Sequence, residues 1–464
     1  MKKIIYWAFI INLIGTAACF SQQFATDFQS IPTNGANDWK SFKIGSVTYL
    51  ALANYQNNTS VEINSAIYKW ENNQFSLFQE LPTQGASDWE YFSINSQHFL
   101  AVANYKSQTS YSVNSVIYTW NGDSMIVYQE IPTCAAYDWE AFSMNDTMFL
   151  AVASQSDESG NNNSYSTIYK WDGAQFDSIQ SIQTHGASDW EAFVIDDTLH
   201  YLAVANTYSL STEIFKWDGN QFVSAQVLSS MGTTGIESFS IDNDYYLATS
   251  NGRDLNSFNT NSKIFKWDGS QFIIYQQIPT IGAFDWEYFS INNHHFLCVA
   301  NYQDNNSNYN LNSVIYKWDG SLFVPIHDVF THGATDWEFL QIENTYYLCV
   351  ANYKDGNEHN IDSKLLLIDE TTLTEEINKR QDFSIKLFPN PTVNQFSISI
   401  NSVLSGPLDV ELRDVYGRLA YSQHVVSASN ETKIEVHLPG LTSGLYFCKA
   451  IMGENSFTLK LIVR

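Results

Sequence analysis

A segment of about 50 residues returns along this chain, and its acidic-aromatic-acidic step is copied nearly letter for letter. The tryptophans at positions 39, 89, 139, 190, 286 and 337 stand in the segments NGANDWK, QGASDWE, CAAYDWE, HGASDWE, IGAFDWE and HGATDWE. Their spacings are 50, 50, 51, 96 and 51 residues, so the long interval hides one more repeat. That repeat has Ile236 and Glu237 where Trp and Glu are expected. Seven copies at a fixed period constrain the architecture more than any other feature.

Each repeat contains four runs with the character of strands. In the second repeat these runs are DWEYFSI, FLAVANY, SVIYTW and MIVYQEI. The second run is almost continuously apolar, as in a strand buried on both faces. A WNGD or WDGxxF turn separates the third and fourth runs, and its glycine suits a tight hairpin. Four antiparallel strands per repeat predict the blade of a β-propeller.

The two ends of the repeat region predict how the ring closes. The region starts with a strand of the fourth type, FATDFQSIPT, and finishes with one of the third type, SKLLLID. Seven complete blades therefore require the first strand to join the last blade, which also removes the exposed sheet edges. We expect an all-β chain with a seven-bladed propeller over residues 22–370.

The repeat resembles a known family. The pattern IPTxGAxDWExF, YLAVANY, SxIYKW and F is similar to the EPTP repeat, also called the EAR or epitempin repeat, of the leucine-rich glioma-inactivated proteins and their bacterial relatives. The resemblance covers all seven units and implies a seven-bladed propeller that works as an extracellular protein-binding module. The fifth unit departs from it by lacking Asp-Trp, and the first has Lys40 in place of Glu.

The C-terminal part has a different character. Residues 371–382 are charged and polar, which indicates a linker. Residues 383–464 alternate as short strands with Asn-Pro, Tyr-Gly and Ser-Gly turns, which predicts a small β-sandwich. Phe388 to Pro391, Gly417-Arg418, Leu441 to Tyr446 and the end at Lys460 to Arg464 resemble the type A sorting domain of the Bacteroidota type IX secretion system. The resemblance implies handling by that secretion machinery, and then release or attachment at the cell surface.

The N-terminal residues predict a signal peptide over residues 1–21. A basic Met1-Lys2-Lys3 precedes an apolar run from Ile4 to Ala18, which is short for a membrane span. Cleavage after Ser21 fits, and lipidation of Cys19 is an alternative. No later segment is long and apolar enough to cross a bilayer, so we expect a mature chain without a transmembrane segment that is secreted or displayed outside the outer membrane.

Charge and cysteine usage narrow the function further. With 23 basic and 49 acidic residues the formal charge is −26, which repels phosphates and excludes a nucleic acid partner. The mature chain has four cysteines. Two of them, Cys298 and Cys349, stand where other repeats have alanine, so we interpret all four as free thiols.

The acidic step itself has two interpretations. Residues two apart on a strand share a face, so Asp88 and Glu90 point the same way while Trp89 packs between blades. Around one axis such carboxylates repel unless they are protonated, hydrogen-bonded or bridged by a cation. One interpretation is a calcium site, because calcium takes several oxygen ligands, and members of the resembled family can carry a channel metal. The candidate ligands are Asp88, Glu90, Asp138, Glu140, Asp189, Glu191, Asp285, Glu287, Asp336 and Glu338, with Asp38 and Glu237 at the equivalent places.

The other interpretation is structural: each Asp caps its own Ile-Pro-Thr turn by bonding backbone amides. His185 and His332 at the equivalent turns are likewise interpreted as turn residues. The loops between the second and third strands are long and rich in Asn, Ser and Tyr, which suits adaptable polar contacts. They lie on the face where the acidic step begins, and we expect this face to bind.

No GxSxG, HExxH, CxxC, GxGxxG or phosphate-loop pattern occurs. The leading hypothesis is therefore a binding or adhesion propeller, not an enzyme, which recognises an extracellular protein or glycan. A metal-dependent hydrolase or lyase at the acidic channel mouth is the alternative, and a spacer without a ligand is the third hypothesis.

Overall fold

The computed structural model describes residues 23–209, 211–369 and, with short gaps, 383–463. The signal peptide proposed for residues 1–21 and the linker proposed for residues 371–382 lie outside the described residues. The chain forms two compact units, one of which covers Gln23–Ile368. In the part of the chain that the structure describes, every regular element is a strand. No helix there is long and apolar enough to cross a membrane.

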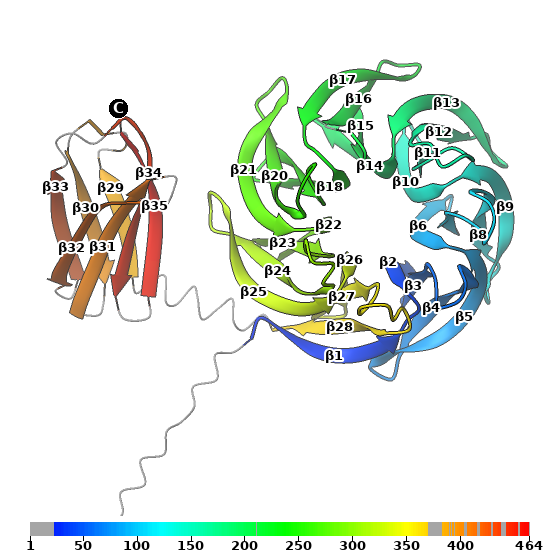
Figure 1. Ribbon diagram of the computed structural model, residues 1–464, viewed down its shortest axis with the longest axis horizontal. Coiled ribbons are helices and arrows are strands. Elements are labelled where there is room, and N and C mark those ends of the chain that lie inside the picture. Colours follow the sequence, from blue (N-terminus) through cyan, green and yellow to red (C-terminus); the bar gives the residue numbers. More distant parts are fainter. Residues whose placement is uncertain are drawn as a thin grey trace, which may run out of the picture. The chain divides into compact units, whose positions relative to one another are not determined.

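The first unit is a propeller of seven four-stranded antiparallel sheets, which confirms the predicted fold class (Figure 1). The innermost strands of blades 1 to 7 are β2 (Ala36–Ile44), β6 (Ala86–Ile94), β10 (Ala136–Met144), β14 (Ala187–Ile195), β18 (Thr233–Ile241), β22 (Ala283–Ile291) and β26 (Ala334–Ile342). The second strands are β3 (Val47–Asn54), β7 (Gln97–Asn104), β11 (Thr147–Ser154), β15 (Leu199–Asn206), β19 (Asp244–Asn251), β23 (His294–Asn301) and β27 (Thr345–Asn352).

The third strands are β4 (Glu62–Glu71), β8 (Ser112–Trp120), β12 (Asn163–Trp171), β16 (Ser211–Trp217), β20 (Asn259–Trp267), β24 (Asn310–Trp318) and β28 (Asp362–Ile368). The outer strands of blades 1 to 6 are β5 (Gln74–Gln84), β9 (Met125–Cys134), β13 (Phe176–His185), β17 (Phe222–Ser229), β21 (Phe272–Ile281) and β25 (Phe323–His332). Blade 7 takes its outer strand from the start of the domain, because β1 (Ala25–Pro32) pairs with β28. The predicted closure is therefore confirmed, and Figure 1 shows blue β1 beside yellow β28.

The sequence explains why each strand takes its place. In β3, Leu50 to Ala53 are all buried, because this strand is covered on both faces by neighbouring blades. In the hairpin between β12 and β13, the Asp172 carboxylate accepts hydrogen bonds from the amides of Ala174 and Gln175 at 2.7 and 2.8 Å. Gly173 in that turn has a φ of 110°, which a residue with a Cβ rarely adopts.

The tryptophans of the acidic step pack between blades, as predicted. Trp89 is fully buried in a cluster that joins Phe42, Ala51 and Ile67 of blade 1 to Leu100 of blade 2. The same arrangement recurs around the ring, and the buried set is Trp39, Trp89, Trp139, Trp190, Trp286 and Trp337. Burial of large aromatic side chains at every seam is the main source of stability of such a ring.

At the circumference, a glutamine in the outer strand of one blade clasps the next blade. Gln79 donates to the carbonyl of Met125 at 2.8 Å and accepts from the amide of Met125 at 2.9 Å. Equivalent two-way clasps are made by Gln29, Gln129, Gln180, Gln226 and Gln276. At the remaining seam, between blades 6 and 7, His327 takes this place and bonds the backbone of Ala25.

The second unit contains the predicted C-terminal β-sandwich. One sheet consists of β29 (Phe383–Phe388), β30 (Gln395–Ser402) and β33 (Asn430–His437). The other consists of β32 (Leu419–Ser427), β31 (Gly406–Asp414), β34 (Gly444–Met452) and β35 (Asn455–Val463). Phe396, Leu412 and Val436 belong to one buried core between the sheets. Among the described residues the cysteines at 134, 298, 349 and 448 are free thiols.

Candidate functional site: an acidic channel beneath an aromatic mouth

The acidic residues singled out in the sequence all line one cavity on the propeller axis. Its volume is about 180 Å³, and twelve carboxylates and Lys40 face it. The carboxylates belong to Asp38, Asp88, Asp138, Asp189, Asp285 and Asp336 and to Glu90, Glu140, Glu191, Glu237, Glu287 and Glu338. The prediction that the two acids of each step point together is confirmed, since both members of every pair line the same space.

The aspartates do not cap their own turns. Five of the six reach to the next blade, whereas Asp285 bonds the backbone of Trp286 on its own strand. The Oδ2 atom of Asp38 accepts a hydrogen bond from the amide of Trp89 at 2.9 Å. The same bond joins Asp88 to Trp139, Asp138 to Trp190, Asp189 to Ile236 and Asp336 to Trp39. The structural interpretation was therefore right about backbone amides and wrong about which ones. A carboxylate here holds two blades together because the amide it bonds belongs to the innermost strand of the next blade.

The glutamates form a second row of the same kind, two residues further along each innermost strand. Glu140 accepts from the amide of Ala192 at 2.9 Å, and Glu287 accepts from the amide of Phe339 at 2.8 Å. The other bonds of this row run from Ser238 to Glu191, from Tyr288 to Glu237 and from Ser41 to Glu338. Together the two rows of carboxylate-to-amide hydrogen bonds join each blade to the next, and we call this set of bonds the inter-blade zipper.

Blade 1 interrupts the glutamate row with a positive charge. The Nζ atom of Lys40 lies 2.5 Å from Oε2 of Glu90 on blade 2. Burial opposes the charge on Lys40, but Glu90 and Glu338 outweigh it and raise the pKa of Lys40 well above its usual value. One ammonium therefore stays charged among the carboxylates.

Blade 5 interrupts the aspartate row with a glycine. A Cβ atom built on Gly235 would lie 2.8 Å from Oδ1 of Asp285 on blade 6, so the carboxylate of Asp285 occupies the space that an aspartate would need. Ser250 bonds both the amide and the carbonyl of Gly235, and the six other second strands have alanine at the position of Ser250. These bonds of Ser250 hold the innermost strand of blade 5, which lacks the Asp-Trp pair of the other blades.

Crowding and burial make the channel acids hard to ionise. Burial raises the pKa of Asp38 to about 7, against the opposing pull of Lys40. Burial likewise raises the pKa of Asp189 to about 7 and that of Glu191 to about 8. For Asp138, burial first and then the charges of Asp189 and Asp88 raise the pKa well above its usual range. Near neutral pH the channel is thus partly protonated.

The fit of a metal ion to these residues is limited by where their oxygens are held. Within residues 23–369 and the described part of the sandwich, no group of three or more His, Cys, Asp or Glu side chains is placed to hold one ion. The zipper bonds keep neighbouring carboxylates on separate amides. A calcium ion would therefore need carboxylates to leave those bonds and converge.

Above the acids lies a collar made by the residue that precedes each of the six aspartates and, in blade 5, by the residue that precedes Gly235. The seven collar residues are Asn37, Ser87, Tyr137, Ser188, Thr234, Phe284 and Thr335. Five of them are polar and donate to a carbonyl of the next blade. For example, Thr234 donates to the carbonyl of Ala283 at 2.9 Å, and Thr335 donates to that of Ala36 at 3.0 Å. Tyr137 and Phe284 replace such donors with aromatic rings.

These two rings complete a circle of six aromatic side chains from blades 1, 2, 3, 6 and 7, which we call the aromatic crown. Tyr137 of blade 3 and Phe284 of blade 6 approach to 6.5 Å between ring centroids. Tyr55, Tyr105, Tyr302 and Tyr353, which follow the asparagine at the end of the second strand, continue the circle. The centroid distances around it are 5.9, 5.6, 6.5, 5.5, 5.9 and 5.9 Å in the order Tyr55, Tyr105, Tyr137, Phe284, Tyr302 and Tyr353.

The crown leaves an off-centre pocket of about 330 Å³ at the mouth of the channel. Blades 4 and 5 have Thr207 and Gly252 where the crown has tyrosine, and both residues line the pocket. Arg253 is its one charged lining residue among those described, and its guanidinium lies 5.8 Å from the ring centroid of Tyr208. The face that the sequence analysis proposes for binding is the face that carries this pocket. The crown was missed, although the repeated Asn-Tyr at the strand ends was a visible signal.

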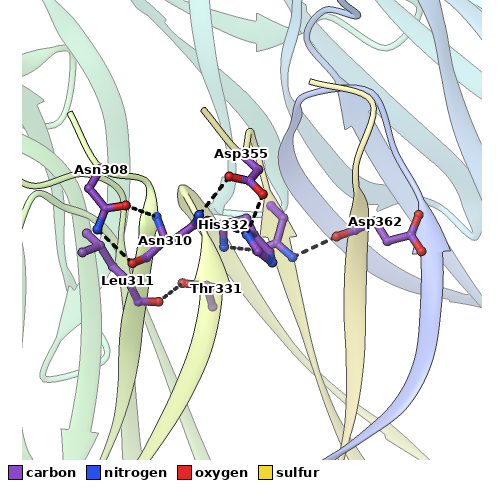
Figure 2. A network of polar contacts seen from close by, with 8 residues as sticks. Asn308, Asn310, Leu311, Thr331, His332, Asp355 and Asp362 are labelled. Carbon is purple, nitrogen blue, oxygen red and sulfur yellow. Dashed lines mark hydrogen bonds and ion pairs between the residues drawn. The ribbon is translucent and has the colours of Figure 1, made fainter. Parts of the chain in front are cut away.

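The loops around this mouth are held by side-chain networks. Figure 2 shows the network between blades 6 and 7, where Asp355 accepts from Asn310 Nδ2 at 2.9 Å. His332 Nδ1 lies 2.6 Å from Asn310 Oδ1, and His185 makes the same contact with Asn163. Both histidines therefore brace turns, in agreement with their interpretation from the sequence.

The fold and the site define a class: a seven-bladed propeller with an inter-blade zipper of acids on its axis, joined to a small sandwich. Seven consecutive matches to the EPTP domain cover residues 26–71, 74–121, 126–172, 175–218, 221–268, 271–319 and 322–369. The chain belongs to the EPTP domain family. Residues 386–464 match the secretion system C-terminal sorting domain, which marks the chain for export to the cell surface or beyond.

Similar proteins are known, but each match is partial. The human thrombospondin-type laminin G domain and EAR repeat-containing protein is 35% identical over 227 residues, which are 45% of this chain and 34% of that protein. Ulvan lyase NLR42 of Nonlabens ulvanivorans is 29% identical over 115 residues, 24% of this chain and 19% of the lyase. The chain thus spans about a third or less of these relatives. The structure of the Dos1 propeller covers 74% of this chain and 95% of its own, with 9% identity and a TM-score of 0.47.

Proposed function

We propose that this secreted propeller is a binding or adhesion protein that recognises an extracellular protein or glycan through the face that carries the crown. One observation carries the proposal: Tyr137 and Phe284 lack the hydrogen bond to a carbonyl of the next blade that the other five collar residues make, although the Tyr137 side chain bonds that of Asn37. A hydrogen bond of this kind contributes about 0.5–1.5 kcal/mol. Two aromatic rings that meet across the axis serve a purpose that the repeat itself does not need.

The surroundings of these rings support binding. A concave pocket with aromatic walls and a few polar groups is the usual form of a ligand site. Around it lie Asn-, Ser- and Tyr-rich loops, whose amides and hydroxyls make adaptable contacts. A second hollow of about 540 Å³ runs between the loops of blades 1 and 2, from Gln56 to Val61 and from Lys106 to Tyr111. The face therefore offers both an anchor pocket and a wider polar surface.

The test is a binding screen with a matched variant. Full-length protein is passed over arrays of cell-surface glycans and extracellular proteins, beside the double variant Tyr137→Ser, Phe284→Thr. These replacements are the collar residues of other blades, so the variant keeps the repeat's own chemistry. We expect at least one ligand that the variant loses while its thermal unfolding stays within a few degrees. The same ligands on both proteins, or none on either, would refute the proposal.

A calcium ion in the acidic channel is a further part of the proposal, with the predicted acids from Asp88 to Glu338 as its ligands. It is supported by their shared cavity. A ligand at a hundred times its dissociation constant stabilises the folded state by about 2.7 kcal/mol. We expect the thermal midpoint to rise in calcium and fall in chelator, and the shift to vanish in Asp88→Asn, Glu90→Gln protein. Element analysis of the purified protein gives the independent readout, and an absent metal with no shift refutes this part.

A metal-dependent hydrolase or lyase is the second candidate. Two observations favour it: the raised pKa values of Asp38 and Asp189, near those of an acid or base that works at neutral pH, and the partial likeness to an ulvan lyase. Incubation of the full-length protein with ulvan and other acidic polysaccharides, with and without calcium, tests it. Unsaturated or reducing ends that depend on Asp189 would establish an enzyme.

A further inference from the structure

The mouth pocket lies directly above the acidic channel. Six collar residues line both cavities, so the crown forms the entrance to the carboxylates. The crown surrounds the entrance incompletely, because Thr207 and Gly252 leave the side of blades 4 and 5 open. Burial raises the pKa of Tyr55 and of Tyr302, so the crown phenols stay neutral near pH 7. A ligand in the pocket therefore meets uncharged aromatic rings on one side and carboxylates below.

This combination favours a positive charge. The face of an aromatic ring attracts cations, and cages of such rings recognise alkylammonium groups. The propeller already places its own cations in this way. Lys354 Nζ lies 4.1 Å from the ring centroid of Tyr309, and Arg253 lies over Tyr208. In the channel, the ammonium of Lys40 lies between carboxylates, 2.5 Å from Glu90.

The aromatic walls also require an apolar body on the ligand. A bare metal ion gains little from six rings, whereas an alkylated ammonium packs its methyl or methylene groups against them. Arg253 opposes this preference at the rim, because its like charge weakens the binding of any cation that enters, and the charged Lys40 opposes it within the channel. Twelve carboxylates lie beneath that single guanidinium, and even partly protonated they dominate the potential in the pocket.

We propose that the crown pocket binds a small organic ammonium ion of the choline type, with its alkyl groups on the crown and its charge toward the channel. The proposal names a ligand class for the site of the proposed function and rests on it. An acidic sugar held by Arg253 is the rival that the same pocket suggests, and the two make opposite predictions at that residue.

The experiment is calorimetric titration of full-length protein with choline and with 3,3-dimethylbutan-1-ol, which has the same shape without the charge. We expect choline to bind at least tenfold more tightly than the alcohol. Phosphatidylcholine vesicles run in parallel distinguish a lipid headgroup from the free ion. Equal binding of choline and the alcohol, or no binding of choline, overturns the proposal.

Three variants locate the site. Thr207→Tyr places a tyrosine at the position that holds Tyr105 in blade 2. The amide of Thr207 donates to the carbonyl of Gly186 as that of Tyr105 donates to Gly85, so the backbone suits this residue. The added ring should abolish binding of choline. Arg253→Gln should raise the affinity for choline several-fold, because a like charge leaves the rim, and a fall instead would contradict the proposal. Tyr165→Ala, an exposed tyrosine outside the crown, should change nothing and serves as control.

These experiments distinguish failure of the ammonium ligand class from failure of the proposed binding function. If choline does not bind but the arrays reveal a ligand that the collar double variant loses, the proposed binding function is supported and the ammonium ligand class is rejected. If neither choline nor any array ligand binds, both fall together.

Discussion

The ammonium nitrogen of Lys40 on blade 1 lies 2.5 Å from a carboxylate oxygen of Glu90 on blade 2. It is the one cation that lines the channel among the described residues. Its side chain is 35% exposed, and the cavity it faces is the acidic channel. The six other blades have a glutamate at this position, so the positive charge of Lys40 offsets part of the repulsion between these glutamates.

Replacing Lys40 with methionine should destabilise the propeller, and more so at pH 8 than at pH 5. The raised pKa of Lys40 keeps its charge constant over that range, while Glu338, whose pKa burial raises, loses charge as the pH falls. We expect a loss of about 1–3 kcal/mol at pH 8, less than for a fully buried pair because the Lys40 side chain is partly exposed. Chemical unfolding at both pH values measures it. Lys69→Met, which breaks a 3.8 Å surface pair, is the control and should cost little.

The propeller should become more stable as the pH falls from 8 to 5. An acid whose pKa is raised on folding binds protons on folding, so its favourable contribution is complete below its unfolded pKa and is lost as the pH rises to the folded value. For Glu191 that window runs from 4.5 to about 8. Thermal midpoints at four pH values test the slope. Glu191→Gln should flatten it, whereas Glu158→Gln on an exposed loop should leave it unchanged.

The zipper predicts opposite effects for two substitutions at Asp138. Asp138→Asn keeps an oxygen for the amide of Trp190, which lies 2.8 Å away, and removes a charge that burial disfavours. We expect a gain on the order of 1 kcal/mol at pH 8. Asp138→Ala leaves a buried amide without its acceptor and should cost about 1–3 kcal/mol. If both substitutions destabilise equally at pH 8, the charge itself is needed, as in a metal site.

The seam between blades 6 and 7 should respond to His327. Burial lowers the pKa of His327, so its contribution is present above the unfolded value of 6.5 and is lost as the pH falls below it. His327→Gln restores the clasp of the other seams and should add about 0.5–1.5 kcal/mol, with the larger gain at pH 5. Hydrogen exchange of β1 reports this seam directly. Gln226→His at another seam should transfer the same pH sensitivity there, and a pH-independent result would contradict this role of His327.

The sequence predicted the blades, the closing strand and the sandwich, because period, alternation and turn residues are local signals. It also predicted that the tryptophans pack and that Asp88 and Glu90 share a face. It did not predict that Asp38 bonds the amide of Trp89, since a repeat shows what each blade carries but not which blade completes the bond. The contact of Tyr137 with Phe284 was out of reach for the same reason: the two residues are 147 positions apart and meet only across a closed ring.

The closing strand has a consequence for how the domain forms. Ser30 of β1 bonds Asp362 of β28, 332 residues further along the chain, whereas the other blades pair strands that are close in sequence. Long-range pairing is the slowest kind to establish. Blades 1 to 6 have all their strands once β25 has emerged, but β1 remains a bare edge until residue 368 arrives. We therefore expect a chain that ends before β28 to leave the edge of β1 exposed to pairing with other strands, and only the entire domain to cover it.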